Sequence, residues 1–229
     1  MYKRQPAHPG RVLHKNTEEV YFFKPVAADQ PDAVKREIRI LRKLEKLNLD
    51  IKAPHLLGFV AYGKSKTEIM GLLLENIEAP TPLTKLLSPS IPEEQRLEWS
   101  RKCEAYIKTL HEHGIVWGDA KADNFIVDAS SSLWIIDFGG SYTEGWVDPE
   151  VSETIEGDDM GLGKVQAALE DPEKNTVDLG LVENEEEVRE TASSLFVTEK
   201  RDETCTSKRK RAEKEVETTY EQEKKVCMQ

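Results

Sequence analysis

The chain has 229 residues and carries 32 basic and 43 acidic side chains, which gives a formal net charge of −11. Its hydrophobic fraction of 38% is low for a compact domain and its charged fraction of 33% is high, so we expect one globular domain and a solvated segment. The apolar runs are far shorter than a membrane span, and no apolar stretch follows the first residues as in a secretory signal. The acidic balance argues against nucleic acid as a partner. We therefore expect neither a membrane nor a nucleic-acid partner.

Cysteine usage and one basic run bear on the compartment. Cys103, Cys205 and Cys227 lie far apart and form no Cys-x-x-Cys pair, which disfavours a disulfide framework or a zinc site. Cys103 has the position of a small core residue on a helix, and the other two are expected to be free thiols. Lys208–Arg211 resembles a basic nuclear-import cluster, although a solvated charge run is the simpler interpretation. These features predict an intracellular protein, cytoplasmic or nuclear.

Composition divides the chain near Glu170. Residues 171–229 are rich in charged side chains and poor in apolar ones, so we predict a disordered tail there, with a transient charged helix over Arg211–Lys225. Residues 1–170 are predicted to form the folded domain, in two blocks, 1–77 and 78–170.

The first block has the pattern of a small sheet with one helix. A short aromatic and β-branched run closed by Pro25 predicts a strand over Val20–Lys24. Two further strands are expected over Leu56–Tyr62 and Ile69–Glu75, joined by a turn around Gly63-Lys64-Ser65. A helix is predicted from Pro31, because apolar residues recur with a period close to 3.6 after it.

The second block is predicted to be mainly helical. A long helix should run from Pro92 to His111, followed by Gly114 as a C′ residue. Its buried side is expected to hold Leu97, Cys103, Ile107 and Leu110.

Three short β runs follow this helix. They cover Ile115–Trp117, Phe125–Asp128 and Leu133–Asp137, and the last two are expected to pair as a hairpin. Strands with one helix, followed by helices with a small hairpin, predict the α+β class.

Four polar residues around the predicted hairpin suit phosphoryl transfer. Asp119 can orient or accept the proton of an attacking hydroxyl, and Lys121 can offset charge on the transferred group. Asn124 and Asp137 offer hard oxygen ligands for Mg²⁺. Gly139 permits a turn directly after the second of these ligands.

The spacing of these residues resembles the protein-kinase superfamily, and fungal protein-kinase-like sequences in particular. Asp119, Lys121 and Asn124 match the Asp-x-Lys-x-x-Asn of its catalytic loop, and Asp137-Phe138-Gly139 stands 13 residues after Asn124, as is typical of kinases. The resemblance implies a bilobal kinase-like fold with a reduced N-lobe sheet and a mostly helical, truncated C-lobe. It also implies that ATP and Mg²⁺ are bound.

Four residues of the first block resemble the nucleotide site of that family. Lys24 resembles the strand lysine that holds the α- and β-phosphates, and Glu37 the helix glutamate that pairs with it. The backbones of Glu75 and Ile77, at the end of the last N-lobe strand, would bond adenine. The ordinary alternatives are a solvated lysine, a surface glutamate and a plain buried strand, and the separation of Lys24 and Glu37 is shorter than usual in kinases.

Asp158 matches the helix aspartate that braces the catalytic loop in kinases. An ordinary helix N-cap is the alternative for this residue. Trp146–Glu150 resembles a variant of the Ala-Pro-Glu motif that closes the activation segment.

The sequence departs from the kinase pattern in several places. No glycine-rich loop precedes Lys24, so the strands that cover the phosphates are expected to be missing or degenerate. Trp117 and Gly118 replace the His-Arg of the catalytic loop, and the segment from Asp137 to Glu150 is short. The polar composition after Gly163 implies that the later C-lobe helices are lost.

The resemblance implies an ATP- and Mg²⁺-dependent phosphotransferase acting on a hydroxyl acceptor, in the first instance Ser or Thr of a protein. One alternative is a catalytically impaired pseudokinase that serves as a binding module, favoured by the missing glycine loop. Another is a small-molecule kinase of the aminoglycoside phosphotransferase type, which Gly118-Asp119 also resembles. Lys121 and Phe138-Gly139 favour the protein-kinase branch over the small-molecule branch.

Overall fold

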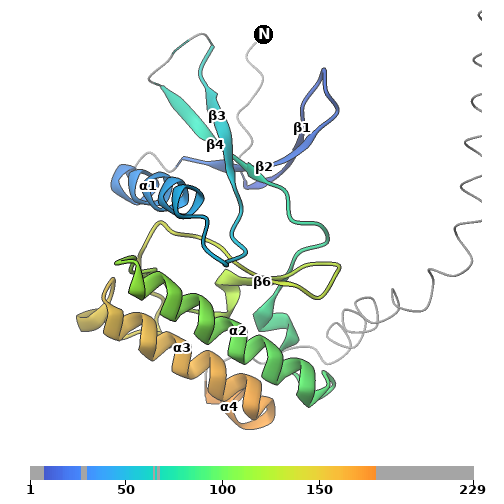
Figure 1. Cartoon of the computed structure of the whole chain (residues 1–229), viewed down its shortest axis with the longest axis vertical. Coiled ribbons are helices and arrows are strands. Elements are labelled where there is room, and N and C mark those ends of the chain that lie inside the picture. Colours follow the sequence, from blue (N-terminus) through green and yellow to red (C-terminus); the bar gives the residue numbers. More distant parts are fainter. Residues whose placement is uncertain (1–7, 27–29, 64, 66–67, 179–229) are drawn as a thin grey trace, which may run out of the picture.

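The computed structural model describes residues 8–26, 30–63, 65 and 68–178. They form two lobes, a sheet with one helix above and a mainly helical lobe below (Figure 1). The predicted transient helix, the basic cluster and two of the three cysteines lie outside the described residues. The α+β, kinase-like class predicted from the sequence is confirmed.

The upper lobe is a four-stranded antiparallel sheet in the order β1-β2-β4-β3. Its strands are β1 (Gly10–Leu13), β2 (Val20–Pro25), β3 (Leu56–Ala61) and β4 (Ile69–Glu75). The central strands β2 and β4 place Lys24 opposite Leu72. This register sets the lysine beside the helix that follows.

The β1–β2 hairpin corrects one expectation. The two strands that would cover a nucleotide are present and fully paired from Gly10↔Phe23 to Leu13↔Val20. Their connection is closed by polar bonds, with Tyr21 Oη and Thr17 Oγ1 both donating to Glu19 Oε2. The missing glycine motif therefore altered the turn without removing the strands.

Helix α1 (Pro31–Leu47) begins with Pro at its first position and ends at Asn48 in the left-handed region with φ 48°. Its apolar stripe buries Ile40, Leu41 and Leu44 in the core that the sheet shares. Glu37 continues the buried face one turn earlier and is 3% exposed. A carboxylate so buried requires a charged or hydrogen-bonding partner.

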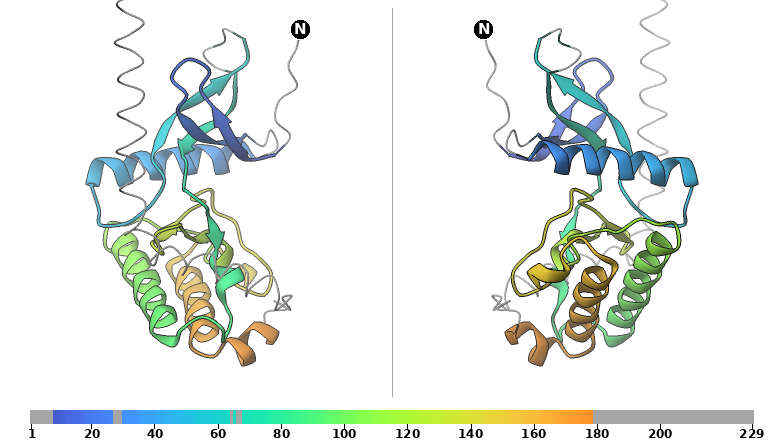
Figure 2. Two further views of the ribbon diagram at one scale, coloured as in Figure 1. Left: turned by 90° about the vertical axis from the view of Figure 1, so that its right-hand side faces the viewer. Right: turned by 90° about the vertical axis from the view of Figure 1, so that its left-hand side faces the viewer.

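The lower lobe packs helices against a small three-stranded sheet in the order β5-β6-β7. Its elements are β5 (Thr81–Pro82), η1 (Leu83–Leu86), α2 (Glu93–Glu112), η2 (Ala122–Asn124), β6 (Phe125–Val127), β7 (Leu133–Ile135), η3 (Pro149–Val151), α3 (Ile155–Glu170) and α4 (Pro172–Asp178). Helices α2 and α3 lie side by side in both views of Figure 2. The predicted β6–β7 hairpin is confirmed.

The buried face of α2 differs from the predicted one at one position. Cys103, Ile107 and Leu110 are buried as expected, but Leu97 is exposed. Trp99 takes its place in the core, with an exposed fraction of 0%. Both residues lie within one turn, and the larger ring buries more apolar area.

Two other segments differ from the sequence-based predictions. Ile115–Trp117 forms no strand, because its backbone bonds to side chains of other elements and not to a neighbouring strand. Pro172–Asp178, the first part of the segment predicted to be disordered, forms helix α4 on the end of α3. The remainder of the predicted tail lies outside the described residues.

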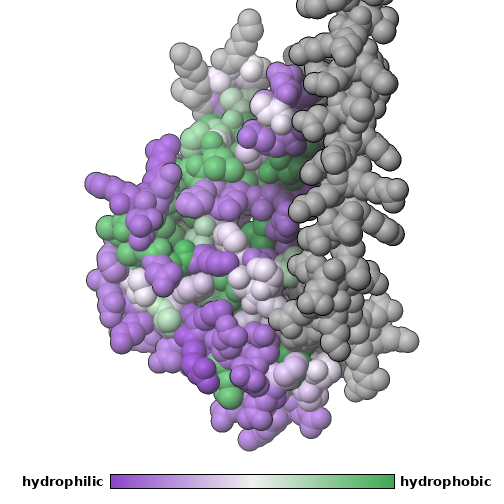
Figure 3. Space-filling view, turned by 45° about the vertical axis from the view of Figure 1, so that its right-hand side comes forward, coloured by the Kyte–Doolittle hydropathy of each residue, from purple (hydrophilic) through white to green (hydrophobic). Residues whose placement is uncertain are grey.

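Hydrophobic side chains on the face drawn in Figure 3 show mainly over the upper and middle parts of the molecule, and the lowest part is mostly hydrophilic. Among the described residues, no helix combines the length and apolarity that crossing a bilayer requires.

Candidate active site

A lysine between two carboxylates marks the junction of the lobes. Lys24 Nζ, from β2, lies 2.8 Å from Glu37 Oε1 of α1 and 2.9 Å from Asp137 Oδ1, which follows β7. The structure thus brings together three residues that the sequence predicted for one site. Asp137 has φ 58°, in the left-handed region, and its Oδ1 also accepts from the Gly139 N–H at 3.4 Å.

The three side chains perturb one another's ionisation. Burial acts to lower the pKa of Lys24, but Glu37 and Asp137 outweigh it and hold that pKa above its usual value. Burial raises the pKa of Glu37 despite its bond to Lys24. Burial also acts to raise the pKa of Asp137, but the charge and hydrogen bond of Lys24, together with the Gly139 N–H and the Lys121 charge, outweigh it and leave that pKa below its usual value. Near neutral pH the lysine is charged and Asp137 is ionised.

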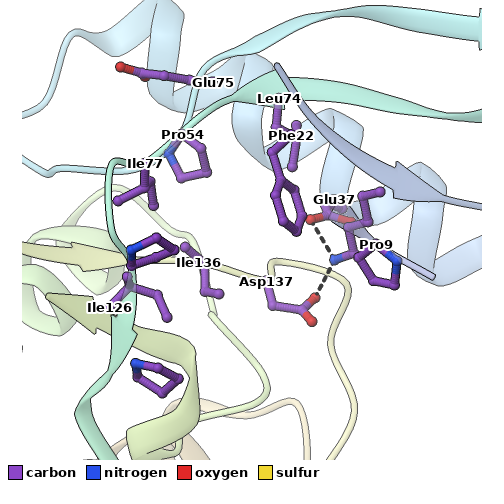
Figure 4. A pocket seen from close by; sticks show the side chains of 13 residues that line it. Pro9, Phe22, Glu37, Pro54, Leu74, Glu75, Ile77, Ile126, Ile136 and Asp137 are labelled. Carbon is purple, nitrogen blue, oxygen red and sulfur yellow. Dashed lines mark hydrogen bonds and ion pairs between the residues drawn. The ribbon is translucent and has the colours of Figure 1, made fainter. Parts of the chain in front are cut away.

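These residues form the polar end of an elongated cleft of about 310 Å³ between the lobes (Figure 4). The rest of its lining is largely apolar and comprises Pro9, Phe22, Pro54, Leu74, Glu75, Ile77, Pro80, Pro82, Ile126 and Ile136. Glu75 and Ile77, predicted to bond adenine, therefore line the same cleft as Lys24. An apolar slot with a few charges at one end is the usual form of a small-molecule site.

A second polar cluster surrounds Asp119. Lys121 Nζ lies 2.9 Å from Asp119 Oδ2, and the Asn124 side-chain amide donates to the same oxygen at 2.8 Å and to the Asp119 carbonyl at 3.0 Å. Asp119 is 6% exposed, and a carboxylate so buried requires hydrogen-bonding partners of this kind. The three residues predicted for the catalytic loop are thus in contact with one another.

Thr143 joins this cluster, and the sequence analysis did not identify it. Its hydroxyl donates to Asp119 Oδ1 at 3.1 Å and accepts from Lys121 Nζ at 2.8 Å. The residue lies 24 positions after Asp119 in a segment without regular structure. No local pattern around it indicated this contact.

Asp158 holds the backbone that leads into the cluster. Its two carboxylate oxygens each accept, at 2.7 Å, from the N–H groups of Trp117 and Gly118, and Oδ2 also lies 2.9 Å from His111 Nε2. The bracing position predicted from the resemblance is therefore occupied. The alternative N-cap role is wrong, because Thr154 caps α3 by accepting from the Gly157 N–H.

Backbone contacts connect the two clusters. The Asn124 carbonyl accepts from the Ile136 N–H at 3.0 Å, and Trp117 Nε1 donates to the Ile136 and Asp137 carbonyls at 3.0 and 3.1 Å. Asn124 and Asp137 are therefore held next to each other. Asn124 binds Asp119 through its side-chain nitrogen, so its amide oxygen takes no part in these bonds. Asp137 accepts from Lys24 and Gly139 through Oδ1, so its second carboxylate oxygen takes no part in them either. Such oxygens are the ligands that Mg²⁺ prefers, so the residues fit that ion.

Comparison with known proteins agrees with this geometry. Over 143 residues, 56% of this chain, it is 29% identical to the mitogen-activated protein kinase kinase kinase MST11 of Pyricularia oryzae, covering 15% of that protein. Over 135 residues, 59% of this chain, it is 30% identical to the KEOPS complex subunit Bud32 of Pyrococcus abyssi, covering 53% of it. The chain thus matches about half the length of one relative and much less of the other. The family model for the protein kinase domain matches residues 10–146, which include both clusters, and the chain belongs to this family.

Proposed function

We propose that this protein is an ATP- and Mg²⁺-dependent phosphotransferase that transfers the γ-phosphate of ATP to a hydroxyl acceptor, Ser or Thr of a protein. The observation that carries the proposal is the ion-paired set of Lys24, Glu37 and Asp137 at the end of the apolar cleft. Glu37 is buried and Asp137 is partly exposed, so keeping a lysine between them costs desolvation energy, and a cleft with such perturbed groups is typical of a functional site.

The cleft offers adenine a largely apolar slot, and Glu75 and Ile77, whose backbones would bond the base, are among its lining residues. Phosphates would then lie toward Lys24, whose cation is already oriented by Glu37. Asn124 and Asp137 are the residues that would hold Mg²⁺, which when bound neutralises charge on the phosphate oxygens.

Asp119 is the residue placed to act on the acceptor. Its carboxylate would orient the acceptor hydroxyl and take its proton as the new oxygen–phosphorus bond forms and the bond from the γ-phosphorus to the ADP oxygen breaks. Lys121, 2.9 Å from Asp119, would offset charge on the transferred phosphoryl group. Thr143 would hold the Asp119 and Lys121 side chains in place through its two hydrogen bonds until an acceptor binds.

Two other functions have specific support. The β1–β2 turn carries Glu18 and Glu19 and no glycine, which disfavours tight phosphate binding and would suit a pseudokinase. Gly118-Asp119 and the short segment after Asp137 would suit a small-molecule acceptor. The assay below separates these possibilities.

The test measures γ-phosphate transfer by the full chain to mixed protein and small-molecule acceptors and to itself. Asp119→Asn should lower kcat by about 10²–10⁴-fold and leave ATP affinity nearly unchanged. Asp123→Asn is the matched control, because Asp123 lies in the same loop but accepts from Thr84 Oγ1 at 2.6 Å instead of joining the cluster. Turnover that survives in Asp119→Asn would refute the assignment of Asp119. ATP binding without turnover in the unmodified protein would favour the pseudokinase.

A further inference from the structure

Arg36, next to Glu37 on α1, reaches across the junction of the lobes. Its Nη2 donates to the Val116 carbonyl at 2.7 Å, and its Nη1 donates to the carbonyls of Trp117 and Phe138 at 2.8 and 2.7 Å. One guanidinium thereby contacts both the segment before Asp119 and the residue after Asp137. The planar fork of arginine suits several acceptors at once, which a lysine cannot match.

The backbone before Asp119 is consequently held from two sides. Asp158 of α3 accepts the N–H groups of Trp117 and Gly118, whereas Arg36 of α1 binds the carbonyls of Val116 and Trp117. An anion from the lower lobe and a cation from the upper lobe thus fix opposite edges of adjacent peptide groups. Charged partners make these hydrogen bonds stronger than those between neutral groups.

Two glycines leave the space that Arg36 occupies. A Cβ at Gly118, with φ +89°, would lie 2.8 Å from Arg36 Nη2. A Cβ at Gly140, with φ +77°, would lie 3.0 Å from Nη1 and 2.6 Å from Glu153 Oε1. Position 118 is the one at which the sequence lacks the arginine of the kinase pattern, and a side chain there would collide with the guanidinium that arrives from α1.

We propose that Arg36 is a positioning residue that fastens α1 to the catalytic loop and to the segment after Asp137. Because Glu37 is the next residue on the same helix, this contact also holds the Lys24–Glu37–Asp137 set together. The protein would then hold its site together through the permanent charge of Arg36. In the kinase pattern, a phosphate on the activation segment does so by pairing with an arginine at position 118, which is glycine here. The expected effect of Arg36 on the rate of phosphate transfer rests on the proposed function. The expected effect on the stability of the contact between α1 and the catalytic loop does not.

The structural arm of the test is amide hydrogen exchange of the full chain across α1 and residues 114–120. Arg36→Gln should speed exchange in both segments together, including the Trp117 and Gly118 amides, by about 5–150-fold, the usual range for coupling between sites. Arg36→Lys should give an intermediate increase, because it keeps a cation without the fork. Arg39→Gln is the matched control, since Arg39 is an exposed residue of the same helix.

The kinetic arm measures phosphate transfer by the same proteins, per folded molecule. We expect kcat to fall by about 5–150-fold in Arg36→Gln, with partial recovery in Arg36→Lys. The KM for ATP should rise as well, because the same contact holds the Lys24–Glu37–Asp137 set that lines the cleft. A lowered melting temperature with unchanged kcat would show a merely structural role and overturn the proposal.

The exchange measurement and the kinetic measurement can each contradict their own claim without deciding the other. If the unmodified protein transfers no phosphate, the proposed function fails, and the exchange data still decide on Arg36. Exchange equal to that of the unmodified protein in both Arg36 variants would overturn the positioning role. If Arg36→Gln does not fold, Arg36→Lys decides by the same criterion.

Discussion

Lys24 Nζ and Glu37 Oε1 are 2.8 Å apart, and the two residues lie 13 positions apart along the chain, fewer than is usual in kinases. The short separation is possible because β2 ends at Pro25 and α1 begins at Pro31, so that Glu37 comes early in the helix. The pair forms without the longer connection that the kinase pattern suggests. A separation that is short for a kinase is therefore compatible with the ion pair, and the nucleotide-binding role of Lys24 stays a prediction.

Replacing the lysine should disable the site. Lys24→Met removes the cation between two carboxylates, so ATP affinity should fall at least tenfold and phosphate transfer should disappear. Calorimetric titration with ATP and a transfer assay measure the two effects. Lys35→Met is the control, because Lys35 is an exposed residue that pairs with Asp32 at the surface. Equal ATP affinity in Lys24→Met and the unmodified protein would contradict the assignment.

Asp137 should control the response to Mg²⁺. In Asp137→Ala we expect ATP binding to become independent of Mg²⁺, because one of the two proposed ligand side chains is gone. Titration of ATP with and without Mg²⁺ gives the difference for each protein. The exposed Asp148→Ala should bind as the unmodified protein does. A metal effect of full size in Asp137→Ala would exclude this residue as a ligand.

Activity should not depend on phosphorylation of the segment after Asp137. Gly118 has no side chain with which to pair a phosphate, and Arg36 already donates hydrogen bonds to three carbonyls. Phosphatase treatment of the purified protein, checked by intact mass, should leave turnover unchanged. Loss of turnover in step with loss of phosphate would show that another cation reads the modification.

Two kinds of signal in the sequence predicted the site. Asp119, Lys121 and Asn124 fall within six consecutive residues, so their spacing alone places them in one loop. Lys24 and Asp137 are 113 positions apart, and only the resemblance to kinases assigned them to one site. The helix from Pro31 followed from apolar periodicity and was found at that position. Such patterns reflect local secondary structure, because the spacing of apolar residues along the chain decides which of them share one face of a helix or strand.

The contacts missed by the sequence analysis join residues far apart. Arg36 meets the lower lobe 80 to 102 positions away, and Thr143 meets Asp119 after a segment without regular structure. On α1, Arg36 is one of several basic residues, and only the folded chain distinguishes it. The β1–β2 hairpin was missed for another reason, because its prediction depended on glycines and its strands form by backbone pairing.

Asp128 closes the β6–β7 turn that follows the catalytic loop and supports the final prediction. Its Oδ1 accepts from the N–H groups of Ser130 and Ser132 at 2.8 and 2.9 Å, and its Oδ2 accepts from Trp134 Nε1 at 2.8 Å. Burial acts to raise the pKa of Asp128, but the bonds from Trp134 and the two serines outweigh it and lower that pKa. The folded state therefore favours the ionised carboxylate more than the unfolded chain does.

The stability that Asp128 contributes should be present above its unfolded pKa of about 3.9 and be lost as the pH falls through its lower folded pKa. In Asp128→Asn an NH₂ group replaces one carboxylate oxygen, so one acceptor is lost and a donor faces the N–H donors of the turn. We expect the free energy of unfolding at pH 7 to fall by about 1–3 kcal/mol. Melting curves of both proteins should show a gap that is constant above about pH 5 and narrows below about pH 4. The exposed Asp148→Asn should show no such gap. If the difference in melting temperature between the two proteins were the same at pH 7 and at the lowest pH at which both fold, packing of the turn, and not the carboxylate charge, would stabilise the β6–β7 turn.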